Sequence, residues 1–131
     1  MLKKTHIVVG VLIAAPIIKY TGLISAIGLL GSTAPDIDYK VGLEHRTITH
    51  SLLLLAITSL FIYLIYPGVA IVWGLTYLSH LVLDSLTVTG VPFMYPFNKK
   101  KYGLKLISTG GDIELYILML LIYLIVIIIT N

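Results

Sequence analysis

The histidines and carboxylates of this chain gather at or near the ends of its apolar segments. All four histidines and five of the six carboxylates lie there: His6, His45, His50 and His80, with Asp36, Asp38, Asp84, Asp112 and Glu114. Ionisable side chains are costly beside hydrocarbon, so each of them is a candidate functional residue. Imidazole nitrogen and carboxylate oxygen are also ligands that Zn²⁺ and similar divalent ions take from proteins. The pattern therefore predicts a metal site.

The composition indicates a membrane protein. The chain has 131 residues, of which 58% are hydrophobic and 11% charged, and its mean hydropathy is +1.02. Soluble domains are about 45–50% apolar and about 25% charged. We expect one domain, residues 1–131. Since there is no cysteine, a metal has to be held by nitrogen and oxygen. The net charge is +3, and four of the nine basic residues are lysines clustered at 99–105, which indicates membrane topology and contact with lipid headgroups rather than nucleic-acid binding.

Five apolar segments predict an all-α, membrane-embedded bundle of about five helices. The first two segments are short and the last three are long: His6–Ile18, Thr21–Ala34, Thr49–Tyr66, Gly68–Val88 and Ile113–Thr130. A membrane-crossing helix needs about 20 residues, so the short pair forms either a tight hairpin or one helix bent near Pro16. The first segment also resembles a signal peptide. Because apolar character resumes directly after Lys19, we expect this segment to be retained.

The basic residues predict an orientation in the membrane. If the five segments all cross, eight of the nine lysines and arginines fall on one side, and Lys19 falls on the other. Positive residues favour the cytoplasmic face. We therefore expect a multi-pass protein of the cell (inner) membrane, with its N-terminus inside and its C-terminus outside. The same count places the histidines and the candidate carboxylates on the cytoplasmic half.

Two carboxylates follow the second apolar segment, in Pro35-Asp36-Ile37-Asp38. Carboxylates at this spacing are within reach of one or two cations, and Pro35 fixes the exit from the helix. Taken alone, the motif fits a helix-ending turn with solvated acids at least as well. The metal-binding interpretation of this motif depends on the histidine motifs that follow.

His50 begins the helix of the third segment, and His45 lies in the approach to it. Arg46 between them suits a phosphate or carboxylate, because its planar guanidinium binds such groups through two hydrogen bonds. Thr47 or Thr49 is a candidate helix cap. The alternative is a polar helix start at the level of the lipid headgroups.

His80 and Asp84 lie four residues apart in the fourth segment and so share one helical face. Both can bind one ion, or Asp84 can orient the imidazole; a structural His–Asp hydrogen bond is the alternative. His6, near the start of the first segment, is by itself more typical of a surface residue. For Glu114, at the start of the last segment, a capping role and a ligand role are equally open.

In this order, the motifs resemble a family of small inner-membrane metal-dependent hydrolases, described as LexA-binding and inner-membrane-associated. The matching pieces are His6, Pro35-Asp36-Ile37-Asp38, His45-Arg46-x-x-Thr49-His50-Ser51, Tyr77-Leu78-Ser79-His80-x-x-x-Asp84, Gly110 and Glu114. That family is thought to be distantly similar to zinc-dependent phospholipase C, an all-helical fold with a cluster of metal ions. The resemblance implies His6, Asp36, His50, His80 and Asp84 as ligands. Tyr39 stands where the family often has histidine, which removes one potential ligand.

The function we expect is metal-dependent hydrolysis of a phosphoester, with a phospholipid or lipid-like phosphate as substrate. Zinc is the expected metal, with two or three ions and these candidate ligands: His6, Asp36, Asp38, His45, His50, His80, Asp84 and Glu114. Asp38 is a candidate bridging ligand or general base, and Arg46 a candidate clamp on the phosphoryl group. Two other classes stay open: a divalent-cation transporter or channel, and a non-enzymatic membrane scaffold with a structural metal site.

Overall fold

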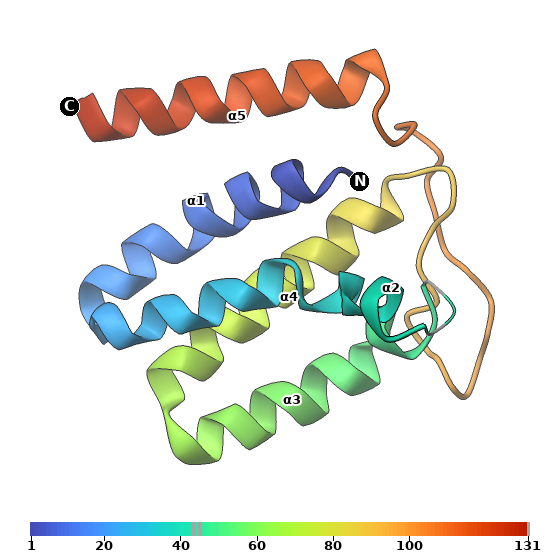
Figure 1. The fold of residues 1–131 in the computed structure, drawn as a ribbon, viewed down its shortest axis with the longest axis horizontal. Coiled ribbons are helices and arrows are strands. Elements are labelled where there is room, and N and C mark those ends of the chain that lie inside the picture. The colour runs from blue at the N-terminus through green and yellow to red at the C-terminus, as the bar shows by residue number, and fades with distance from the viewer. Residues whose placement is uncertain (43, 45, 131) are drawn as a thin grey trace.

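The computed structural model describes residues 1–42, 44 and 46–130, and these form an all-α fold (Figure 1). Its α-helices and 3-10 helices (η) follow in the order α1 (Lys3–Thr21), η1 (Leu23–Ser32), η2 (Ala34–Ile37), α2 (Asp38–Val41), η3 (Ile48–His50), α3 (Leu52–Ile65), α4 (Pro67–Ser85) and α5 (Asp112–Thr130). Isolated bridges, Thr87 with Ile107 and Val91 with Tyr102, tie down the long loop before α5. The predicted fold class is confirmed.

The first two elements form a hairpin rather than one bent helix. α1 is 19 residues long and contains Pro16, so it is longer than the segment expected from hydropathy. The difference arises because the lysines at both ends of that segment take part in the helix. Gly22 ends α1 with φ of 89°, a conformation that glycine adopts without steric cost. The chain then reverses into η1.

α3 and α4 form a second hairpin, joined by Tyr66. Pro67 opens α4, where its missing N–H costs no hydrogen bond. The cap of α3 is Ser51, whose Oγ accepts a hydrogen bond from the Leu54 amide at 3.2 Å. The prediction that Thr47 or Thr49 caps this helix is therefore wrong.

η1 lies directly against α4 because glycines face that helix. A Cβ atom at Gly28 would lie 2.6 Å from the Trp73 amide nitrogen, and one at Gly31 would lie 2.5 Å from the Trp73 carbonyl oxygen. Small residues allow such close backbone contact in helix bundles. The contact brings the end of η1, at Ser32, beside the C-terminal half of α4.

The distribution of side chains suits an apolar solvent. Tyr77, Leu81 and Val91 form the buried apolar cluster, but many of the other buried side chains are polar. α3 is strongly apolar and yet has no buried residue; Leu64, for example, is 76% exposed. α1 and α4 are each long and apolar enough to cross a membrane. Apolar helix surfaces around a polar interior are expected of a protein surrounded by lipid.

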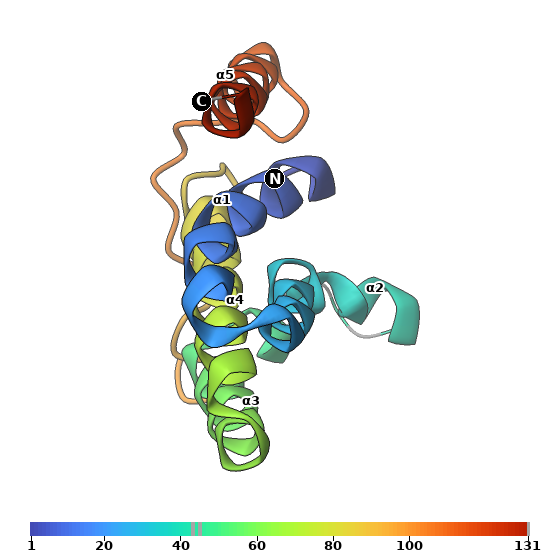
Figure 2. The ribbon, with the colours of Figure 1, turned by 90° about the vertical axis from the view of Figure 1, so that its left-hand side faces the viewer.

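The turns of the two hairpins lie at one end of the bundle, and the polar interior lies at the other. Figure 1 shows the start of α1, the end of α4, the start of α5 and helix α2 at the same end. The α1–η1 turn, the α3–α4 turn and the C-terminus lie at the opposite end. Figure 2 shows α5, α1, α4 and α3 stacked in a column, with η1 and α2 to one side.

Candidate metal centre

Five of the eight predicted ligands converge in the polar interior, and all five are buried: His6, Asp36, His50, His80 and Asp84. They come from four separate segments. His6 lies on α1, Asp36 on η2 and His50 at the end of η3, while the last two lie on α4. Residues far apart in the sequence therefore meet at one point.

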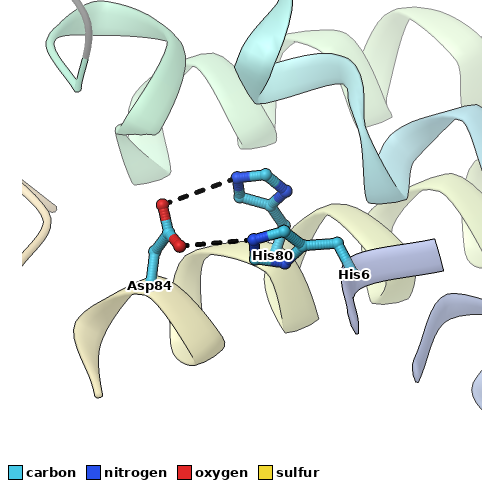
Figure 3. A group of neighbouring side chains, drawn as sticks. All are labelled: His6, His80 and Asp84. Atoms are coloured by element: carbon cyan, nitrogen blue, oxygen red, sulfur yellow. Dashed lines mark ion pairs between the residues drawn. The ribbon is translucent and has the colours of Figure 1, made fainter. Parts of the chain in front are cut away.

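These residues form two groups of three that share His80. His6, His80 and Asp84 make one group (Figure 3), and Asp36, His50 and His80 make the other. Within each group, one ligand atom of each residue lies within 4.8 Å of the others. Such separations fit donors that surround a common ion.

Asp84 lies between the histidines and offers a different oxygen to different partners. Its Oδ1 atom lies 3.3 Å from Nε2 of His6, and its Oδ2 atom lies 3.5 Å from Nε2 of His50 and 3.7 Å from Nε2 of His80. The α-amino group of Met1 also pairs with Oδ1. Asp36 faces the same space, because its Oδ1 atom lies 3.6 Å from Nε2 of His80.

The ring of His80 is oriented as a metal ligand. Its Nδ1 atom lies 2.7 Å from the carbonyl oxygen of Ser32. A carbonyl can only accept, so Nδ1 carries the proton and Nε2 keeps a lone pair. Nε2 is buried and has no hydrogen-bond partner among the described residues. Second-shell hydrogen bonds of this kind fix the tautomer of ligating histidines.

His6 supports the same interpretation. Its ring stacks on that of His80, with centroids 3.7 Å apart and planes inclined by 14°. Neither of its ring nitrogens forms a hydrogen bond within the described part of the chain. Buried polar atoms are normally paired. Two adjacent imidazoles with unused nitrogens beside two carboxylates are a donor set that fits a divalent cation.

Asp38 lies behind His50 and is in neither group of three. Its Oδ2 atom accepts hydrogen bonds from the Arg46 amide at 3.2 Å and from Thr49 Oγ1 at 3.0 Å. The same oxygen is 3.5 Å from Nδ1 of His50. Its Oδ1 atom accepts from the Tyr39 amide. These contacts suit a residue that orients His50 and shapes the preceding loop.

Arg46 is buried at the edge of the centre. Its Nη1 atom donates to Thr87 Oγ1 at 2.9 Å and to the Gly90 carbonyl at 3.1 Å, and Nη2 lies 3.1 Å from Asp84 Oδ2. Its φ of 58° is uncommon for a residue with a side chain and persists only where the surroundings impose it. Arg46 therefore joins the loop before η3 to the end of α4 and holds one oxygen of Asp84.

Glu114 is fully buried, but its carboxylate is occupied by the protein. Oε1 accepts hydrogen bonds from the Leu2 amide at 2.6 Å and from Thr5 Oγ1 at 2.9 Å, and Oε2 accepts from the Gly110 amide at 2.7 Å. It thus ties the start of α5 to the start of α1. The remaining predicted ligand, His45, lies outside the described residues.

A pocket of about 530 Å³ opens onto the centre. Asp36 and Asp84 reach its wall, together with Lys3, Tyr39 and Arg46. Lys3, which the sequence indicated only as a topology residue, lines this pocket together with Asp36 and Asp84. The Ser32 carbonyl was not predicted either, because a backbone acceptor leaves no signal in residue type.

Apolar helices surrounding a buried cluster of histidine and aspartate define a membrane-type protein with a candidate metal centre. The chain belongs to the YdjM inner membrane protein family, which matches residues 1–131. It is 33% identical to the uncharacterized protein YvsG of Bacillus subtilis (strain 168), a match that covers 73% of this chain and 74% of that protein. No solved structure matches the chain. Family membership confirms the predicted association with the inner membrane.

Proposed function

We propose that this protein is a membrane-bound, metal-dependent hydrolase that acts on a phosphoester. The observation that carries the proposal is the state of His80. Its Nδ1 atom is anchored to Ser32, and its buried Nε2 atom points without a hydrogen-bond partner at two carboxylates of the described chain. An arrangement that leaves a buried nitrogen unsatisfied is costly unless a ligand completes it.

The residues that would hold the metal are the five that converge: His6, Asp36, His50, His80 and Asp84. Three nitrogen and two oxygen donors favour zinc among the common divalent ions. The two oxygens of Asp84 face different histidines, which supports a site for two ions. When bound, a divalent ion supplies Lewis acidity, which lowers the pKa of water and offsets charge on a phosphoryl oxygen.

The surrounding residues suit an anionic substrate. Lys3 and Arg46 line the pocket and provide positive charge next to Asp36 and Asp84. Nε of Arg46 has no hydrogen-bond partner in the described residues, although both terminal nitrogens are bound. Lys3 and Arg46 would therefore attract the phosphoryl group and hold it at the pocket wall. In this proposal Asp38 acts through His50, as a positioning residue.

The position and openness of the centre favour hydrolysis over the two alternatives. A transporter would hold its ion near the middle of the bundle, whereas these residues converge beside His80 and Asp84 in the last turns of α4. A structural metal site is closed by protein ligands, whereas this one adjoins a pocket of about 530 Å³. Both features support an exchangeable position for water and substrate.

The test is a panel of phosphomonoesters and phosphodiesters, both water-soluble and lipid-linked, assayed with detergent-purified protein. We expect hydrolysis that a chelator abolishes and that added zinc restores. The His80→Ala variant should lose this activity, and Ser79→Ala, which changes the neighbouring residue, should keep it. Hydrolysis that persists after chelation and in the His80→Ala variant would contradict the proposal. The absence of any hydrolysis by zinc-loaded protein would also contradict it.

A further inference from the structure

The pocket at the candidate metal centre continues into an apolar groove. A second hollow, of about 410 Å³, shares Lys3 and Asp36 with that pocket and extends to Leu30 and Trp73. A third hollow, of about 500 Å³, shares Leu30 and Thr33 with the second and lies against α1 and η1. The three hollows therefore adjoin one another from the centre to the cleft between α1 and η1, and we call this row of hollows the α1–η1 groove.

The groove is charged at one end and apolar along the rest. On α1, the lining residues are Lys3, Ile7 and Val11, which follow each other at intervals of four and share one helical face. From Lys3 to Val11 this face extends about 12 Å. Ile27 and Leu30 of η1 also line the groove. Lys3, at the end nearest the metal centre, is a counter-charge for an anion.

This polarity matches one class of ligand, an amphiphile with an anionic head and a hydrocarbon chain. The exposed apolar surface of α3 has no charged residue along its length, because Leu52–Ile65 contains no lysine, arginine or acid. The α1–η1 groove differs in that it ends at a lysine and at two carboxylates of the metal centre. An acyl chain in the groove would place its headgroup at that centre.

We propose that the α1–η1 groove binds the acyl chain of a lipid whose phosphate group lies at Lys3 and the metal centre. The proposal rests on the hydrolase function proposed above and names its substrate class as a lipid phosphoester drawn laterally from the bilayer. Leu30 is the apolar residue that lines both hollows that receive the chain.

Trp73 makes the groove directly observable, since it is the single tryptophan of the chain and lines the second hollow. Brominated acyl chains quench tryptophan fluorescence on contact. The experiment titrates detergent-purified, zinc-loaded protein with a monoacyl phosphonate brominated on its chain, a phosphate-lipid analogue that resists hydrolysis. A lipid with the same chain and an uncharged headgroup is the matched ligand. We expect saturable quenching, with half-saturation at a lower concentration for the phosphonate lipid.

Leu30→Gln should raise the half-saturation concentration of quenching about tenfold, because a polar side chain replaces an apolar contact of the acyl chain. Leu120→Gln on α5 is the matched control, since Leu120 is 58% exposed and Leu30 is 61% exposed. Melting temperatures confirm that both variants fold, and Ile7→Gln replaces Leu30→Gln if the latter does not fold. Equal quenching by both lipids, unaffected by Leu30→Gln, would reveal bulk lipid contact only and overturn the proposal.

Parallel assays of a water-soluble phosphoester separate this inference from the proposed function. Headgroup-dependent quenching without hydrolysis of any phosphoester would support the lipid groove and refute the hydrolase. Metal-dependent hydrolysis of the soluble ester without headgroup-dependent quenching would support the hydrolase and refute the groove.

Discussion

The carbonyl oxygen of Ser32 lies 2.7 Å from Nδ1 of His80 and directs the opposite nitrogen of that ring at Asp36 and Asp84. Ser32 ends η1, whereas His80 lies on α4. The orientation of this candidate ligand therefore depends on how closely η1 packs against α4. Gly31, the residue before Ser32, controls that distance.

Gly31→Ala tests this dependence. The added Cβ would lie 2.5 Å from the Trp73 carbonyl, so η1 has to move away from α4. We expect a loss of about 1–3 kcal/mol in stability and a drop of about tenfold in metal affinity, because Ser32 no longer fixes the imidazole. Thermal unfolding and metal titration measure the two effects.

The control for Gly31→Ala is Gly74→Ala, within α4. A Cβ there would meet only the side chain of Ser59, at 3.3 Å for the nearest atom, and alanine favours the helix. This variant should keep its metal affinity. Unchanged metal affinity in Gly31→Ala would show that the Ser32 contact does not position His80.

Asp38→Asn distinguishes a positioning residue from a general base. If Asp38 orients His50 through Nδ1, the variant should bind metal about 10–100-fold more weakly and recover activity at saturating metal. Metal titration followed by assays at saturation gives both numbers. Loss of activity at full metal occupancy, with unchanged affinity, would instead identify Asp38 as a general base. Glu44→Gln changes an exposed carboxylate nearby in sequence and should leave both unaffected.

Glu114→Gln tests whether this carboxylate is a ligand or a clamp. Both of its oxygens accept hydrogen bonds from protein donors. In the glutamine variant, the side-chain NH2 group would face the donors that one of these oxygens now binds. We expect a loss of about 1–3 kcal/mol in stability with metal stoichiometry unchanged at saturation. If the folded variant bound fewer metal ions per chain, Glu114 would be identified as a metal ligand. Asp112→Asn, an exposed position two residues earlier, should have a smaller effect on stability.

Membrane orientation is predicted from the basic residues. Lys3, Lys4 and the lysines of the loop before α5 lie toward the end of the bundle that holds the candidate metal centre, and Lys19 lies near the α1–η1 turn. The rule for positive residues then places the centre at the cytoplasmic face. Reporters fused after Lys101 and after the C-terminus should localise to the cytoplasm and the periplasmic or outer side, respectively. Localisation of both on the same side would contradict a crossing by α5.

Residue types and spacing were sufficient to predict the helical class, and the family resemblance implied the five candidate ligands that the structure brings together. His80 and Asp84 share a helical face at any packing angle, and an imidazole or carboxylate in an apolar chain needs a polar partner. The roles of Asp38, Arg46 and Glu114 could not be deduced in this way. Each depends on which backbone amides and hydroxyls surround it, and these come from segments up to 112 residues away, as in the contact of Leu2 with Glu114.

Hydropathy also could not predict the lengths of the first two elements. Lys3 and Lys4 belong to α1 because a helix can continue past an apolar segment when its charged ends reach a polar environment. The close contact of η1 with α4 depends on the positions of Gly28 and Gly31 relative to α4. The sequence contains these glycines, but only the packing of the helices shows that they face α4.

Metal content is the most direct measure of the central claim, which is that His6, Asp36, His50, His80 and Asp84 hold a divalent ion. Elemental analysis of detergent-purified protein should find at least about one ion per chain. A chelator should remove this ion and lower the melting temperature, and zinc should restore both; His80→Ala should bind less metal than Ser79→Ala. Protein that is free of metal at neutral pH and neither binds zinc nor changes its melting temperature when zinc is added would contradict the account.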